Sequence, residues 1–263
     1  MKFTNLKKAA LAAGLFIGFS VAANAQGPYA KLGLGYNFAS GGETLEQRNA
    51  NQREQIKLNY GQGVVGQAAL GYMFNPNIGA ELGFGYLAGA KTETKSVYNN
   101  RVENHTYHAR MVLLQPSIII SAGKEGLNPY AKFGLVAAKG KAVHLEETSH
   151  NSAIELEWHS TGGWGLGLQA ALGLEVGLSD QLAFFTELSM NNLTYAPHRS
   201  EVVMYRHNGA DHLPLLRVRD RETEYVDTYL SDDNRHDSLP REQLKENLPF
   251  SSVGVNFGVK FNF

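Results

Sequence analysis

The end of the chain alternates strictly between large apolar side chains and small or polar ones. In residues 252–263, six apolar residues occupy every second position, and Gly, Asn and Lys fill most of the positions between them. Successive side chains of a β-strand point to opposite faces. This segment therefore predicts a strand with an apolar face and a polar face, as a strand between lipid and a polar lumen requires.

Seven further segments show the same kind of alternation, at 29–38, 64–74, 78–88, 106–120, 130–139, 164–178 and 182–195. The connections between the eight segments are alternately short (75–77, 122–128, 179–181) and long (39–63, 91–105, 140–163, 196–250). Outer-membrane barrels combine tight periplasmic turns with long outer loops. The pattern predicts an all-β fold, a closed eight-stranded antiparallel transmembrane β-barrel with short periplasmic turns and four long extracellular loops.

The first residues predict an export signal. Lys2, Lys7 and Lys8 precede an apolar stretch at 9–21, and Ala23-Asn24-Ala25 fits the small-residue cleavage rule. We expect a signal peptide at 1–25, a barrel domain at 26–263 with its long loop at 196–250, and location in the bacterial cell outer membrane.

Composition excludes several classes of site. The chain has no cysteine, which excludes disulfides, zinc–thiolate sites and a cysteine nucleophile. Its formal net charge of −1 gives no electrostatic reason to expect nucleic acid as a partner. We expect no cofactor and no resident metal.

Charged residues fall on the polar faces of the predicted strands. The inward set is Lys31, Glu81, Arg110, Lys132, Glu175, Glu187 and Lys260. Side chains just fill the interior of an eight-stranded barrel, and buried charges must be paired. We therefore expect a charge network that seals the lumen. The alternative is a narrow porin-like channel in which these charges guide ions or small solutes.

The predicted outer loops carry the remaining candidates. The fourth is dense in charge of both signs between 211 and 247, and exposed loops are where binding sites usually lie. We expect a surface-interaction platform for an extracellular ligand, without enzymatic activity. The alternative enzyme is a lipid A-modifying hydrolase using His198 and Ser200, since a serine hydrolase needs a histidine beside its nucleophile. The nine histidines, all in or beside long loops, leave metal capture or pH sensing open.

Two motifs carry a family resemblance. Tyr-Ala-Lys-x-Gly opens the segments at 29 and 130, and the chain ends in Asn262-Phe263. With the signal peptide and the eight alternating strands, the chain resembles the small outer-membrane barrel proteins of the OmpX-like, OmpA transmembrane-domain and Opacity groups, collected as the outer membrane protein beta-barrel domain. The resemblance implies a monomer in outer-membrane lipid and lipopolysaccharide. It also implies that the barrel assembly machinery recognises Phe257, Phe261 and Phe263.

Overall fold

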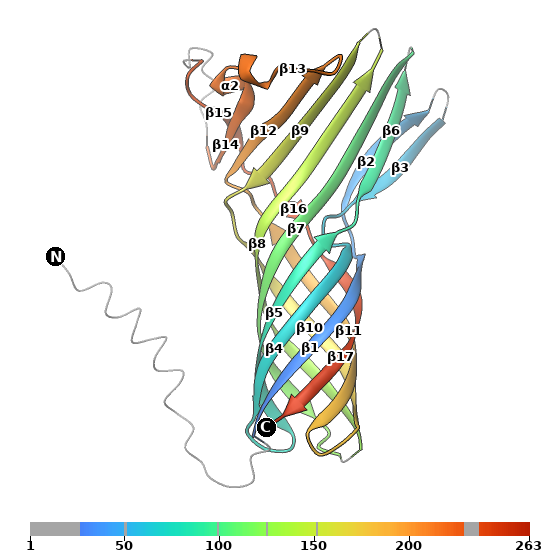
Figure 1. Ribbon diagram of the computed structural model, residues 1–263, viewed down its shortest axis with the longest axis vertical. Coiled ribbons are helices and arrows are strands. Elements are labelled where there is room, and N and C mark those ends of the chain that lie inside the picture. Colours follow the sequence, from blue (N-terminus) through green and yellow to red (C-terminus); the bar gives the residue numbers. More distant parts are fainter. Residues whose placement is uncertain (1–26, 50–51, 99, 125, 151, 229–236) are drawn as a thin grey trace, which may run out of the picture.

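The computed structural model describes residues 27–49, 52–98, 100–124, 126–150, 152–228 and 237–263. The predicted signal peptide lies outside these residues. Within them, none of the helices is long and apolar enough to cross a membrane. Figure 1 shows a lower part of tilted, crossing strands and an upper part in which strands splay outward as a sheet.

All eight predicted strands are present. They are β1 (Gly27–Ala39), β4 (Gly63–Met73), β5 (Ile78–Gly89), β7 (Arg101–Ser121), β8 (Leu127–Ser149), β10 (Gly165–Gly177), β11 (Leu182–Tyr195) and β17 (Ser252–Asn262). Each pairs antiparallel with the next of the set. The last strand, β17, pairs with both β11 and β1. The lower part of the molecule, which we call the barrel, consists of these strands.

The four predicted long loops contain further strands, and the described residues form seventeen strands in total. The additional elements are β2 (Glu43–Asn49), β3 (Gln52–Leu58), β6 (Thr92–Tyr98), β9 (Ala153–Thr161), β12 (Arg199–His207), β13 (Ala210–Asp211), η1 (Leu213–Leu215), α2 (Val218–Arg221), β14 (Glu222–Val226), β15 (Arg241–Leu244) and β16 (Leu248–Pro249). β7 and β8 run for 21 and 23 residues and offer long edges above the barrel. Polar segments pair along those edges, although they lack the apolar alternation that marks the barrel strands.

An upper sheet, a side lobe and the hairpin of β2 and β3, which pairs with β6, lie above the barrel. The upper sheet is formed by β6, the upper halves of β7 and β8, β9 and β12, which pair side by side. The side lobe comprises α2, β14 and β15, and β14 attaches it to β12 through three residue pairs. Figure 1 shows the side lobe next to β12, on the side of the sheet away from β2 and β3.

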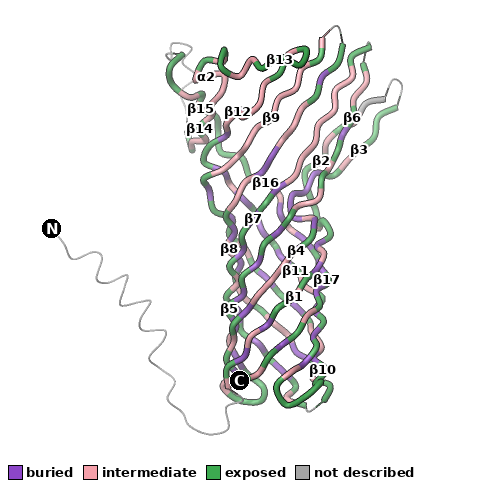
Figure 2. Tube along the Cα trace, in the orientation of Figure 1, coloured by how far each residue is buried: buried purple, intermediate pink, exposed green. Residues whose placement is uncertain are grey.

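The barrel strands alternate between an exposed apolar face and a buried inner face (Figure 2). Leu166 and Leu172 of β10 are 70% and 66% exposed, whereas Gln169 and Ala171 between them are buried. Two apolar clusters lie inside. The lower one is Tyr29, Met73, Ile119 and Tyr130, and the upper one includes Tyr60, Met111, Tyr195 and Phe250.

Candidate functional site

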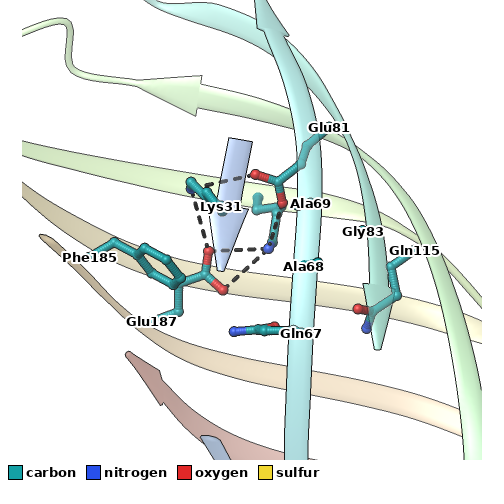
Figure 3. A pocket seen from close by; sticks show the side chains of 10 residues that line it. Lys31, Gln67, Ala68, Ala69, Glu81, Gly83, Gln115, Phe185 and Glu187 are labelled. Carbon is teal, nitrogen blue, oxygen red and sulfur yellow. Dashed lines mark hydrogen bonds and ion pairs between the residues drawn. The ribbon is translucent and has the colours of Figure 1, made fainter. Parts of the chain in front are cut away.

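The lumen contains a compact charge cluster built from six of the seven predicted residues. Lys132 places its ammonium 3.0 Å from Glu81 Oε1 and 3.1 Å from Glu187 Oε1. Lys31 lies 3.1 Å from Glu175 Oε1 and 3.5 Å from Glu81 Oε2. Figure 3 shows the Lys31 ammonium between the carboxylates of Glu81 and Glu187, with contacts to both.

A third lysine completes the charge balance. Lys260 Nζ lies 2.9 Å from Glu175 Oε2, so Glu175 bridges Lys31 and Lys260. Three lysines thus meet three glutamates, and all six side chains are nearly inaccessible to solvent. Pairing of this kind is what allows charges to remain buried, because removal of either partner leaves an uncompensated ion.

Two tyrosines belong to the cluster although they were not among the predicted residues. The Tyr29 hydroxyl donates to Glu81 Oε2 at 3.1 Å, and the Tyr130 hydroxyl donates to Glu187 Oε1 at 2.7 Å. The Lys31 ammonium also lies 4.3 Å from the centre of the Tyr130 ring, within cation–π range. The sequence contained a pattern from which the role of these two tyrosines could have been predicted. Each tyrosine stands two residues before a cluster lysine, on the same face of its strand.

The same arrangement of a tyrosine, a glycine and a glutamate occurs twice in the cluster, once in each half of the barrel. Tyr29 is in register with Gly71, which is in register with Glu81. Tyr130, Gly173 and Glu187 have the same relationship in β8, β10 and β11. The sequence Gln-Ala-Ala-Leu-Gly occurs at both 67–71 and 169–173, which extends the repeat beyond the Tyr-Ala-Lys motif. The two halves of the barrel therefore supply equivalent groups to one cluster.

The prediction for Arg110 is wrong. Its side chain is exposed on the outer face of β7, between buried Ala109 and buried Met111. Both faces of β7 are apolar over much of its length, so alternation in the sequence did not define which residues point inward. The structure places Arg110 in register with Lys141 of β8, outside the lumen.

Two small cavities lie in the lumen, one beside the charge cluster and one between the cluster and the polar residues above it. They measure about 10 Å³ and 20 Å³, enough for isolated water molecules. Buried amide atoms of Gln67, Gln169 and Asn256 face this region without a protein partner. The upper apolar cluster follows, with the Tyr60 and Phe250 rings stacked at 5.5 Å. A charged layer, a polar layer and an apolar layer thus succeed one another along the lumen.

A larger cavity, of about 370 Å³, lies above the apolar layer. The upper sheet contributes Tyr107 and Trp158, the side lobe contributes Arg221 and Tyr225, and Tyr60 is shared with the layer below. Three arginines and three acidic residues line it, together with aromatic rings and hydroxyl groups. Small-molecule sites commonly have volumes of several hundred Å³ and combine apolar walls with a few polar groups.

An aromatic row crosses the upper sheet beside this cavity. Tyr107, His144 and Trp158 are cross-strand partners. Their ring centres are 4.4 Å and 5.0 Å apart. His105 Nδ1 lies 3.1 Å from His144 Nε2. Burial, together with the neighbouring His105, lowers the pKa of His144 to about 4. At neutral pH the row is therefore uncharged.

The two residues of the proposed hydrolase pair lie in different surroundings. β11 ends at Tyr195 and β12 begins at Arg199, so His198 lies at a bend between the strands. His198 is exposed, whereas Ser200 is buried and its Oγ lies 3.1 Å from Ser160 Oγ. The predicted assembly residues Phe257, Phe261 and Phe263 all lie exposed on the outer face or at the end of β17.

A family model for the outer membrane protein beta-barrel domain matches residues 9–199. The chain belongs to this family. As a member of the outer membrane protein beta-barrel domain family, it is an outer-membrane protein of bacteria. No curated protein matches the chain.

Three solved structures align with most of this chain at low sequence identity. OprG from Pseudomonas aeruginosa aligns at 11% identity with a TM-score of 0.44, over 92% of this chain and 98% of OprG. Outer Membrane Protein W from E. coli aligns at 13% identity with a TM-score of 0.36, over 92% and 100%. Ail, the attachment invasion locus protein of Yersinia pestis, aligns at 10% identity with a TM-score of 0.33, over 90% and 99%.

Proposed function

We propose that the protein is a monomeric surface-interaction platform, in which a sealed barrel holds an extracellular binding structure above the outer membrane. The eight barrel strands would form a closed ring that spans the membrane, since β17 pairs with β1. The short turns and both ends of the barrel domain would face the periplasm, and the upper sheet and side lobe would face outward.

The observation that carries the proposal is the contrast between the lumen and the region above it. Between its two ends the lumen is filled by charged, polar and apolar layers, and the cavities among these layers measure only about 10 Å³ and 20 Å³. At the turn end of the barrel, a cavity of about 320 Å³ is lined by residues of the short turns together with Glu175 and Lys260. The cavity between the upper sheet and the side lobe is larger, about 370 Å³. Ligand-sized space therefore exists at the two ends of the barrel but does not continue through it, and the larger of the two cavities lies above the barrel.

Binding can be tested by adhesion of cells that display the protein. Cells carrying wild-type protein or a variant lacking 211–247 would be applied to surfaces coated with collagen, fibronectin or polysaccharide. We expect wild-type cells to adhere to at least one surface and the deletion variant to lose that adhesion. Heat-modifiable migration of both proteins would verify that the barrels are folded.

Point variants separate the cavity from the general surface. Trp158→Ala and Tyr225→Ala change the cavity lining, whereas Tyr98→Ala changes an exposed ring at the tip of β6. We expect adhesion to fall with the first two and to persist with the third. Adhesion equal to that of cells without the protein, on every surface, would contradict the platform function.

The channel alternative makes a different prediction. A conducting lumen would have to open both the Lys31–Glu175 contacts and the layer around Phe250. Recording of ionic current through the refolded protein in a planar bilayer distinguishes a channel from a sealed platform. We expect no current through the wild-type protein. Discrete current steps that change in Glu187→Gln would instead favour the channel.

The proposal assigns no catalysis to the chain. The exposed His198 and the buried Ser200 give a hydrolase no paired nucleophile and base. We therefore expect lipid A from cells that express the protein to have the same mass spectrum as lipid A from cells that express Ser200→Ala.

A further inference from the structure

The cavity of about 370 Å³ between the upper sheet and the side lobe, which we call the upper cavity, has a lining with balanced charges. Among the described residues, the charged side chains of the lining are Arg219, Arg221, Arg241, Glu43, Asp220 and Glu246. His144 also lines the cavity, and its pKa of about 4 leaves it neutral at pH 7. Three cations and three carboxylates give these residues a formal net charge of zero, so the lining does not concentrate ions of either sign.

Two of the arginines already have carboxylate partners. Arg221 Nη2 donates to Glu201 Oε1 at 2.8 Å, and Glu201 lies outside the cavity lining. Arg241 Nη2 lies 3.9 Å from Asp220 Oδ1, while Asp220 Oδ2 accepts a hydrogen bond from Arg217 Nε at 2.8 Å. A guanidinium has five N–H donors, so pairing balances its charge and leaves donors for a ligand. These groups can therefore hydrogen-bond an uncharged molecule.

A network of hydroxyl groups lies in the same lining. Ser160 of β9 and Ser200 of β12 are cross-strand partners, and their hydroxyl oxygens lie 3.1 Å apart. The Tyr225 hydroxyl of the side lobe is hydrogen-bonded to both serines, and burial raises its pKa, so it keeps its proton at neutral pH. Thr223 and Gln243 add a further hydroxyl and an amide. Groups of these kinds both donate and accept hydrogen bonds, which suits a ligand that has many hydroxyls of its own.

The aromatic row forms one wall of the upper cavity. His144 lies between Tyr107 and Trp158, with ring centres 4.4 Å and 5.0 Å away, so a flat aromatic ligand has no room to insert between these rings. Trp158 is half-buried, and its cross-strand partner on the other side is Val202, a smaller side chain that also lines the cavity. The indole thus offers an apolar surface to aliphatic C–H groups.

We propose that the upper cavity binds an uncharged carbohydrate, the end of a neutral glycan. Sugar hydroxyls would hydrogen-bond the paired charges and the hydroxyl network, and sugar C–H groups would pack against Trp158. A hydrocarbon would instead cover the charged side chains without hydrogen bonds, which is costly. The inference rests on the platform function proposed above, and names the ligand class of the same site.

Binding of the refolded protein, in detergent, to immobilised oligosaccharides tests the ligand class. The probes are neutral oligosaccharides that end in glucose, galactose, mannose or an N-acetylhexosamine, and the same oligosaccharides carrying sulfate or sialic acid. We expect at least one neutral oligosaccharide to bind, and its sulfated and sialylated forms to bind no more tightly. Tighter binding of a charged form would overturn the assignment, because a lining without net charge gives it no advantage.

Matched variants test the site. Tyr225→Phe and Gln243→Ala each remove a polar group of the lining, whereas Tyr98→Phe and Gln55→Ala change exposed side chains outside it. We expect each cavity variant to bind the neutral oligosaccharide about fivefold more weakly, the usual effect of one hydrogen bond. The two control variants should keep the wild-type affinity. Equal affinities for cavity and control variants would overturn the assignment.

Fluorescence locates the sugar without altering the polar lining. The chain has two tryptophans, Trp158 in the upper cavity and Trp164 on the exposed outer surface. In Trp164→Phe the tryptophan emission comes from Trp158 alone, and we expect the bound oligosaccharide to shift it. In Trp158→Phe the emission of Trp164 should not change. A shift of Trp164 without a shift of Trp158 would place the sugar outside the cavity and refute the site.

The carbohydrate assignment and the platform function can fail separately. Adhesion that depends on 211–247, combined with no binding to any oligosaccharide of the panel, would refute the carbohydrate and leave the platform intact. Heat-modifiable migration of each variant verifies that its barrel is folded before affinities are compared.

Discussion

Tyr29 and Tyr130 occupy equivalent positions in the two halves of the barrel. Each ring covers a glycine on the neighbouring strand, and each hydroxyl donates to a glutamate one strand further on. The strand pairings that connect tyrosine, glycine and glutamate are the same in both halves. An internal repeat thus supplies two tyrosines and two glutamates to the charge cluster. The ion pair of Lys260 with Glu175 is not part of this repeat.

Removing a cluster carboxylate should destabilise the barrel strongly. In Glu175→Gln, both Lys31 and Lys260 lose an ion-pair partner within the lumen. We expect the free energy of unfolding to fall by about 3–5 kcal/mol, because a buried charge is left unpaired. Urea titration of the refolded protein in detergent measures the free energy of unfolding. The control is Glu246→Gln, which changes an exposed glutamate. A loss no greater than that of the control would show that the cluster is solvated.

The tyrosine hydroxyls should each make a smaller contribution. Tyr130→Phe removes a 2.7 Å hydrogen bond to Glu187 and keeps the ring over Gly173. We expect a loss of about 2 kcal/mol, typical of a hydrogen bond to a charged group. Tyr72→Phe, on the exposed face, should change stability by less than about 0.5 kcal/mol in the same titration. Equal effects from both variants would contradict the assigned role of Tyr130.

The glycine beneath each ring should be irreplaceable while the ring is present. A Cβ at Gly173 would lie 2.2 Å from Tyr130 Cζ, so the ring would have to move. We expect Gly173→Ala to lower the free energy of unfolding by about 1–3 kcal/mol, the usual range for overpacking. In a Tyr130→Ala background the same substitution should have little effect. An additive double-mutant cycle would show that ring and glycine are not coupled.

The upper sheet should respond to acid through His144. Its pKa is about 4 in the folded state and 6.5 when unperturbed, so folding favours the neutral ring. The stabilisation is therefore complete above pH 6.5 and is lost as the pH falls toward 4. Amide protection in β8 and β9, corrected for intrinsic exchange, should decrease over this window. His144→Gln should abolish the dependence, and His150→Gln, an exposed histidine, should retain it. An imidazole titration of His144 near pH 6.5 would contradict the prediction.

Alternation along the sequence was sufficient to locate the barrel strands and most of the lumen charges. All eight segments are strands, and Lys31, Glu81, Lys132, Glu175, Glu187 and Lys260 are directed inward. The reason is that lipid and lumen impose opposite demands on successive residues, which leaves a period of two in the sequence. Where both faces of β7 are apolar this period disappears, and Arg110 was placed on the wrong side.

Only the tertiary structure determined which inward residues meet, and what lies above the barrel. Contacts such as Lys132 with Glu81 and Glu187 depend on the tilt and stagger of strands far apart in the sequence. The polar strands of the upper sheet carry no lipid-imposed alternation, and they pair because β7 and β8 continue beyond the barrel. Register likewise brings Arg110 and Lys141 together from two strands.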